Sequence, residues 1–178
     1  VDEWLQCGVV AAWDVVIHRV DARGRESGAP RPPLHPRYVG SPRMSALGRH
    51  LSAGLELTTS TRITALEETV SGGWVLIDEG GSSYGPFDSV AVAVPAAQAA
   101  PLLVGRPELA RLAAAAALEP CQTLMLRFDE PVTVPWDAAT VSEGALAWVA
   151  RDSSKPGRPP GHVWVAQSSA EHAERFLE

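Results

Sequence analysis

The chain has 178 residues, of which 15 are lysine or arginine and 21 are aspartate or glutamate, and its formal net charge is −6. This acidic balance excludes a general nucleic-acid-binding protein, which would present a basic face. Hydrophobic residues make up 46% of the chain, and the longest apolar stretches, residues 90–97 and 112–118, are far shorter than the roughly 20 residues of a membrane-spanning helix.

The composition therefore predicts a globular protein without a nucleic-acid or membrane partner, and the order of helices and strands described below predicts the α+β class. The two cysteines, Cys7 and Cys121, lie far apart and show no metal-like spacing. That usage is typical of a reduced compartment, so we expect a cytoplasmic protein.

Both ends of the chain resemble parts of helices. Residues 1–6 have the pattern of the last turns of a helix, and the helical pattern that follows residue 170 stops without a glycine cap or a proline. We expect the chain to be an internal fragment of a larger protein.

The first third of the chain predicts strands, a loop and a helix. Residues 9–20 are rich in β-branched and aromatic side chains and predict one or two strands. Residues 21–36 contain four prolines and predict a long exposed loop. Residues 41–51 predict a helix, with Ser41 as its N-cap and Pro42 at its first position.

The middle of the chain predicts a β-meander followed by a buried strand. Residues 55–59 and 61–66 are short alternating runs, and glycine pairs form turns on both sides of residues 74–78. Residues 87–94 are short and almost continuously apolar, which is typical of a strand buried on both faces of a parallel sheet.

The last third predicts helices and antiparallel strands. The expected helices are residues 96–103, residues 107–118 and a final helix capped by Ser168 or Ser169. The expected strands are residues 121–128 and the antiparallel pair 145–150 and 162–167.

One serine motif and the five histidines are candidates for a catalytic or a metal site. Residues 81–85 match the G-x-S-x-G pattern of a hydrolase, but that mechanism needs a helix after the serine, and here another strand is expected. A hairpin turn is the favoured interpretation. The five histidines show no metal-ligand spacing, so we expect no metal.

A polar cluster extends over residues 148–158. It combines an indole, two guanidiniums, two hydroxyls and an ammonium at the junction of a strand and a loop. Such a set suits an anionic or aromatic ligand. The alternative is a solvated loop beside a core tryptophan.

Three segments carry a resemblance to a known family. They are residues 38–47 (Y-V-G-S-P-R-M-S-A-L), residues 61–66 together with 85–88 and 91–98, and residues 147–158 (A-W-V-A-R-D-S-S-K-P-G-R). These segments resemble the renalase-like branch of the flavin-containing amine oxidase superfamily, which consists of FAD-dependent oxidoreductases. The third segment is the most specific of the three.

The resemblance implies an antiparallel-sheet substrate domain inserted in part of a glutathione-reductase-type FAD/NAD(P)-binding domain. Residues 1–54 would begin the substrate domain and lead back to the FAD domain. Residues 55–104 would form the β-meander and buried strand of an incomplete FAD domain. Residues 105–178 would form the substrate-binding domain.

The resemblance also implies roles for individual residues. Ile63 would meet the adenine through its backbone, and Ala93, Val94 and Pro95 would line the approach to the ribose and pyrophosphate of FAD. The strands between residues 121 and 167 would cover the isoalloxazine ring. The substrate-side residues would be Trp148, Arg151 and Lys155.

The chain lacks two parts of the family pattern. It contains no G-x-G-x-x-G strand–turn–helix to hold the pyrophosphate and no C-terminal glycine–aspartate segment to hold the ribityl chain. We therefore expect the chain alone to bind FAD weakly or not at all and to be inactive. Gln122 and Thr123 stand where many flavin amine oxidases place a lysine, so amine oxidation is the looser expectation.

The sequence supports two hypotheses about function. The first is a fragment of a FAD-dependent oxidoreductase that transfers a hydride from a reduced small molecule, dihydronicotinamide-like or an amine, to flavin. The alternative is a non-catalytic α+β domain that binds a small ligand or a partner. The sequence identifies neither a catalytic residue nor an oligomeric state.

Overall fold

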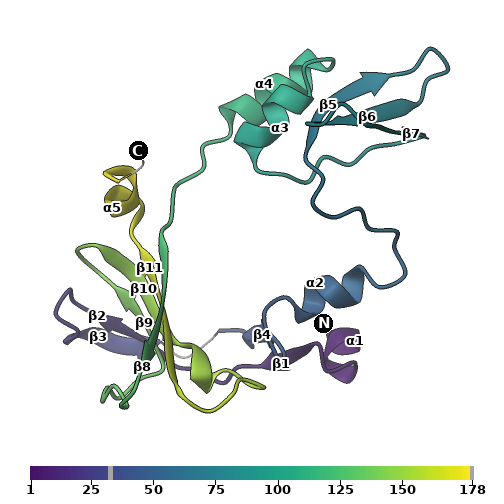
Figure 1. Cartoon of the computed structure of the whole chain (residues 1–178). Coiled ribbons are helices and arrows are strands. Elements are labelled where there is room, and N and C mark those ends of the chain that lie inside the picture. The colour runs from purple at the N-terminus through teal and green to yellow at the C-terminus, as the bar shows by residue number, and fades with distance from the viewer. Residues whose placement is uncertain (32–33, 177–178) are drawn as a thin grey trace. The chain divides into compact units, whose positions relative to one another are not determined.

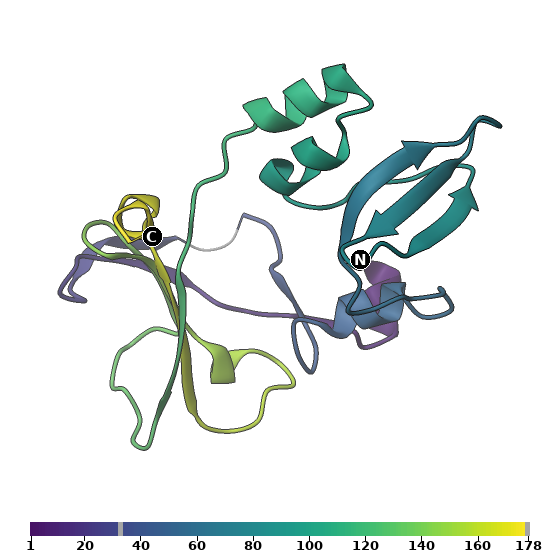
Figure 2. The same cartoon turned by 45° about the horizontal axis from the view of Figure 1, so that its top comes forward.

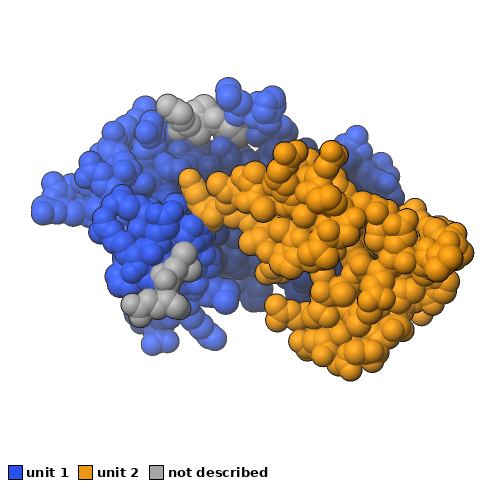
Figure 3. All heavy atoms as spheres, turned by 90° about the horizontal axis from the view of Figure 1, so that it is seen from above, with its two compact units in different colours: residues 1–55, 120–178 blue, residues 56–119 orange. Residues whose placement is uncertain are grey.

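The computed structural model describes residues 1–31 and 34–176. The chain forms two compact units, residues 1–55 with 120–178 and residues 56–119 (Figure 3). The structure places residues 105–119 in the second unit, rather than with residues 120–178 as the sequence predicted. The reason is that α4 (Pro107–Ala115) packs against α3 (Ala96–Leu102).

The first unit is built on a six-stranded sheet with the strand order β3-β2-β9-β10-β11-β8 (Figures 1 and 2). Its strands are β2 (Ile17–Val20), β3 (Glu26–Arg31), β8 (Thr123–Phe128), β9 (Ala138–Val141), β10 (Leu146–Arg151) and β11 (His162–Ser168). The predicted antiparallel pair is confirmed, since β10 and β11 pair in that way. The neighbours are antiparallel except β2 and β9, which run parallel.

The predicted loop over residues 21–36 is wrong in part, because it contains β3. This strand lies at the edge of the sheet and pairs only with β2. An edge strand tolerates a proline such as Pro30, since one side of its backbone needs no strand partner. Residues 32–33 of the predicted loop lie outside the described residues.

The remaining elements of the first unit are short. They are the antiparallel pair β1 (Val10–Ala12) and β4 (Tyr38–Gly40), the helices α1 (Asp2–Gln6), α2 (Ala46–Leu51) and α5 (Ala170–Glu174), and the 3-10 turn η1 (Asp152–Ser154). Ser169 caps α5 by accepting a hydrogen bond from the His172 amide, as predicted.

The helix predicted from Ser41 begins only at Ala46. The cause is a long-range contact, because the Arg158 guanidinium donates hydrogen bonds to the carbonyl oxygens of Gly40 and Pro42. In a helix that began at Pro42, the Ala46 amide would bond to the Pro42 carbonyl, but here it bonds to the Arg43 carbonyl instead.

The core of the first unit combines large and small side chains. Trp13, Val15 and Val39 pack with two alanines, Ala138 and Ala150, that face each other across β9 and β10. Small side chains at paired positions leave space above the sheet for the Trp13 indole. The tryptophan is thereby fixed in place and is only 9% exposed.

The second unit contains a three-stranded antiparallel sheet and two helices. The strands are β5 (Ile63–Glu68), β6 (Trp74–Asp78) and β7 (Ser83–Phe87), paired in chain order as predicted. The helices α3 and α4 agree with the predicted ones.

Two predicted strands of the second unit are wrong. Residues 55–59 form no strand. Of the strand predicted at residues 87–94, only Phe87 lies in a strand, at the end of β7, and Val94 is 43% exposed. A strand needs a hydrogen-bonded neighbour for its backbone groups, and no described strand pairs with residues 55–59 or 88–94. Within the described ranges, no helix has the length and apolar character needed to cross a membrane.

Candidate functional site

An open pocket of about 660 Å3 lies on one face of the six-stranded sheet. Alternate residues of a strand point to the same face, and the pocket uses Val163, Val165 and Gln167 of β11 in this way. Met125 of β8, which pairs with Val165, lies on the same face. We call this space the sheet pocket.

Aromatic side chains give the sheet pocket its chemical character. Trp13, Tyr38 and Trp148 line it, and they come from three segments far apart in the chain. Aromatic and thioether side chains around an open apolar space suit a flat, unsaturated ring. The cluster predicted around Trp148 is therefore part of a pocket and not only a solvated loop.

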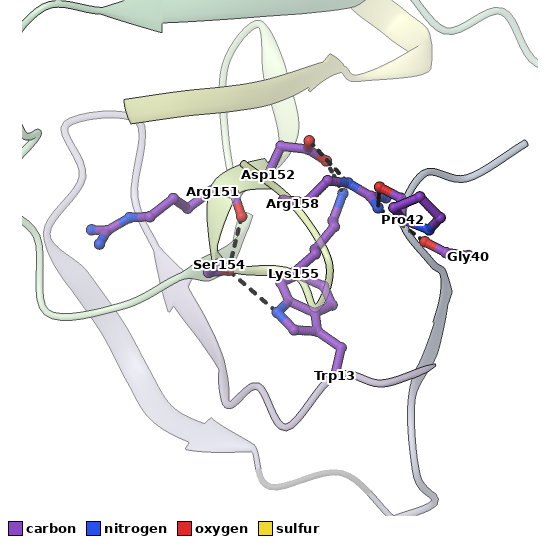
Figure 4. Close-up of polar contacts among 8 residues, drawn as sticks. All are labelled: Trp13, Gly40, Pro42, Arg151, Asp152, Ser154, Lys155 and Arg158. Carbon is purple, nitrogen blue, oxygen red and sulfur yellow. Dashed lines mark hydrogen bonds and ion pairs between the residues drawn. The ribbon is translucent and has the colours of Figure 1, made fainter. Parts of the chain in front are cut away.

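Lys155 supplies a positive charge beside the aromatic rings. Its Nζ atom donates a hydrogen bond to Asp152 Oδ1 at 2.8 Å and lies 5.5 Å from the centroid of the Trp13 ring (Figure 4). Its side chain is only 13% exposed. A cation over the face of an indole is attracted by the electrons of the ring, so Lys155 and Trp13 hold each other in position.

The turn η1 links the two tryptophan-bearing segments. The Ser154 hydroxyl donates to the Arg151 carbonyl at 2.8 Å and accepts from Trp13 Nε1 at 3.2 Å. This relay connects the end of β10 to the segment after β1, so the loop carries Lys155 to the pocket in a fixed orientation.

Arg158 has a structural role in this loop. Its side chain is 7% exposed, and its Nε atom lies 3.3 Å from Asp152 Oδ2. It also donates to the Gly40 carbonyl at 3.0 Å and to the Pro42 carbonyl. Asp152 is thus shared between Lys155 and Arg158. Arg158 in turn ties the loop to the end of β4 and to Pro42 (Figure 4).

Arg151 does not line the sheet pocket. Its guanidinium carbon lies 5.0 Å from the centroid of the Trp164 ring, and its Nε atom lies 3.3 Å from Asp137 Oδ1. The side chain points away from Lys155 and Arg158 (Figure 4). Of the three expected substrate-side residues, the structure brings together Trp148 and Lys155 and leaves Arg151 on the other face of the sheet.

Sequence reasoning missed several residues of this pocket. Gln167, Val165 and Val163 could have been found, since their alternation within the predicted strand marks one face. No sequence pattern marks Trp13 and Tyr38 as pocket residues. They come together only because β1 pairs with β4.

The four residues expected at FAD lie in the second unit. Ile63 begins β5, an edge strand, so one side of that strand has no neighbour in the sheet. Ala93, Val94 and Pro95 lie in an extended, exposed segment. Val92, just before this segment, and Leu66 of β5 both line a pocket of about 250 Å3.

Two of these four residues have the open backbone that close approach of a cofactor would require. Ala93 and Val94 make no backbone hydrogen bond to another described residue, and their small side chains allow a cofactor to approach the backbone closely. They provide no cationic group for the pyrophosphate.

The serine motif at residues 81–85 is a hairpin turn, as favoured by the sequence. Gly81 has a φ of +81° between β6 and β7, and Ser83 begins a strand rather than a helix. Asp78 closes this turn by accepting a hydrogen bond from the Ser82 amide at 2.8 Å and another from the Tyr84 hydroxyl at 2.9 Å. These bonds lower the pKa of Asp78, and the bond to Asp78 raises the pKa of Tyr84.

No protein-family model matches the chain. Across residues 1–31 and 34–176, no three His, Cys, Asp or Glu side chains are grouped as a metal site would require. The sheet pocket, with its aromatic lining and Lys155, is the candidate functional site.

Proposed function

We propose that this chain is part of a FAD-dependent oxidoreductase of the renalase-like kind, in which the sheet pocket binds a reduced, planar small molecule. The observation that carries the proposal is the combination of Trp13, Tyr38 and Trp148 around one open pocket. The resemblance of the Trp148–Arg158 segment to the renalase-like branch agrees with it. A dihydronicotinamide-like ring is the substrate that we propose first, and an amine is the looser candidate.

The proposed chemistry needs little from the side chains. When bound, FAD supplies the hydride acceptor, its N5 atom. The chain would hold the flat substrate ring between aromatic side chains and limit the access of water to it. A hydride transfer requires no acid–base pair, so Asp152 and Lys155, which bond to each other beside the pocket, need not move a proton in it.

The second unit would contribute to FAD binding. Ile63 would offer its backbone to the adenine, and Ala93, Val94 and Pro95 would let the ribose and pyrophosphate approach. These are the contacts that the family resemblance implies. The backbone groups of Ala93 and Val94, which bond to no residue that the structure describes, support them.

The test measures flavin content and flavin reduction in the full protein that contains this chain. We expect that protein to purify with FAD, and a dihydronicotinamide added without oxygen to bleach the flavin absorbance. Trp148→Ala should slow the bleaching at least about tenfold, because it removes a surface that positions the ring. Trp4→Phe, a tryptophan outside the pocket, is the control and should leave the rate unchanged.

A second function is favoured by the fact that the whole sheet pocket lies within the first unit. Such a pocket is sufficient for a non-catalytic domain that binds a small ligand. A colourless full protein that does not take up FAD, but still binds a planar ligand in a Trp148-dependent way, would contradict the oxidoreductase and support this alternative.

A further inference from the structure

Another open pocket of the first unit lies between the end of α1 and α2 (Figures 1 and 2). It measures about 530 Å3, and its walls come from residues 7–9 on one side and from the segment 41–50 on the other. The Ser41 amide donates a hydrogen bond to the Val9 carbonyl at 3.0 Å, which continues the pairing of β1 with β4 by one step. The two walls are therefore held side by side. We call this space the helix pocket.

Basic side chains give the helix pocket its chemical character. Arg43, Arg49 and His50 line it together with Ala46. Residues three and four positions apart lie on the same face of a helix, so Arg49 and His50 share the face of α2 that Ala46 turns to the pocket. Arg43 joins them from the segment just before α2.

The positive charge of the helix pocket is not neutralised by the part of the chain that the structure describes. Arg43 and Arg49 are exposed, and neither guanidinium forms an ion pair or a hydrogen bond with a described residue. By contrast, Arg106, Arg151 and Arg158 each have a carboxylate partner. Among the described residues that line the pocket there is no carboxylate. The whole chain has a net charge of −6, so this hollow is positive on an acidic protein.

We propose that the helix pocket binds a small oxyanion that carries at least two negative charges. This site is separate from the sheet pocket and does not depend on the proposed function. A guanidinium presents parallel N–H groups that match two oxygens of a phosphate or a carboxylate group, and two guanidiniums suit a multiply charged anion. The His50 imidazole and the Ser41 hydroxyl add further donors. The volume of the pocket lies within the usual range of small-molecule sites, about 300–1,000 Å3.

The first test is calorimetric titration of the chain at low salt with inorganic pyrophosphate and, separately, with citrate. We expect at least one of the two anions to bind, and its affinity to fall at least about tenfold in the double variant Arg43→Gln/Arg49→Gln, because two charge-assisted hydrogen bonds are lost. A preference between the two anions shows whether the site takes phosphate or carboxylate groups. The matched control is Arg111→Gln, since Arg111 is also an exposed arginine on a helix but lies in the second unit. It should leave the affinity unchanged.

The second test uses the two cysteines to locate the bound anion. The exposed thiol of Cys7 lines the helix pocket, whereas Cys121, also exposed, lies just before β8. Iodoacetamide, an uncharged reagent, alkylates a thiolate, whose sulfur displaces iodide. We expect a saturating concentration of the anion to slow the alkylation of Cys7 at least about threefold by blocking access to it. The rate at Cys121, measured in the same sample by peptide mass spectrometry, should not change.

The outcomes decide the proposal. If neither pyrophosphate nor citrate binds, it is overturned. Binding that persists in the double variant, or that leaves the alkylation of Cys7 unchanged or slows both cysteines alike, shows that the anion lies elsewhere and overturns it as well. Loss of binding in the double variant together with protection of Cys7 alone supports it. None of these results bears on the reduction of flavin, so the proposed function is tested independently.

Discussion

Asp152 holds together the loop that follows β10. Its carboxylate pairs with Lys155 and with Arg158, whose side chains are 13% and 7% exposed. Removing the carboxylate leaves two poorly solvated cations without an anion. We expect Asp152→Asn to lower the free energy of unfolding by about 2–3 kcal/mol, measured by urea denaturation.

The matched control is Asp137→Asn. Asp137 pairs with Arg151, but these side chains are 46% and 31% exposed. Water screens such a pair, so its loss should change stability by less than about 1 kcal/mol. Equal effects of the two substitutions would show that the partial burial of Lys155 and Arg158 has no energetic consequence.

At the scale of residues, strand periodicity could have corrected one of the site predictions. Trp148 and Arg151 are three positions apart in a single strand, which places them on opposite faces of the sheet. The structure has this arrangement. The roles of Asp152 and Arg158 could not be predicted, because the partners of Arg158 include Gly40 and Pro42, more than a hundred residues away.

The turn between β6 and β7 gives a prediction at the scale of elements. Hydrogen bonds from the Ser82 amide and the Tyr84 hydroxyl lower the pKa of Asp78. A lowered pKa in the folded state adds stability above the unfolded pKa of about 3.9, and this stability is lost as the pH falls through the folded pKa. Amides of β6 and β7 should therefore lose protection from hydrogen exchange below about pH 4.

The variant that tests this is Asp78→Asn. In this variant the amides of β6 and β7 should be less protected from hydrogen exchange near neutral pH. Their protection should also change less with pH in the acid range. Asp88→Asn is the control, since Asp88 follows β7 and accepts no hydrogen bond from a described residue. An acid dependence that survives in Asp78→Asn would rule out this carboxylate as its source.

Elements that depend on local signals were predicted well. Glycine turns, alternation and capping located β5, β6, β7, β11 and α5. The errors concern pairing. Residues 90–94 have the side chains of a buried strand but no strand partner in the described chain, whereas β3 contains a proline but gains a partner in β2. Composition alone does not say which strands meet.

The division into two units predicts local responses to core mutations. Each unit has its own sheet and its own backbone hydrogen bonds. Leu76 lies in the middle strand of the second unit and pairs with Leu66 and Tyr84. Because it is half-buried, we expect Leu76→Ala to destabilise that unit by about 1–2 kcal/mol.

Hydrogen exchange measured residue by residue checks this. Faster exchange in Leu76→Ala should be confined to residues 56–119, and Ala150→Gly should speed exchange only in the first unit. Uniform acceleration across the chain in either variant would show that the two units unfold as one.

For the whole molecule, the α+β class was predicted, but the extent of each unit was not. The sequence places α4 beside the strands that follow it, and the structure packs it against α3. Helix pairing is decided by tertiary contacts that the amphipathic pattern of one helix does not specify.

The parallel pairing of β2 with β9 has a consequence for synthesis on the ribosome. Ile17 in β2 pairs with Ala138 in β9, and the second unit lies between them in the chain. Residues 56–119 emerge as one continuous segment, so they can fold while β9 is still unmade. Until β9 has been synthesised, β2 and β3 form an isolated hairpin, and the edge of β2 that later pairs with β9 has no partner. This is the state most exposed to aggregation. A nascent chain stalled before residue 138 should need chaperone protection that the completed sheet does not.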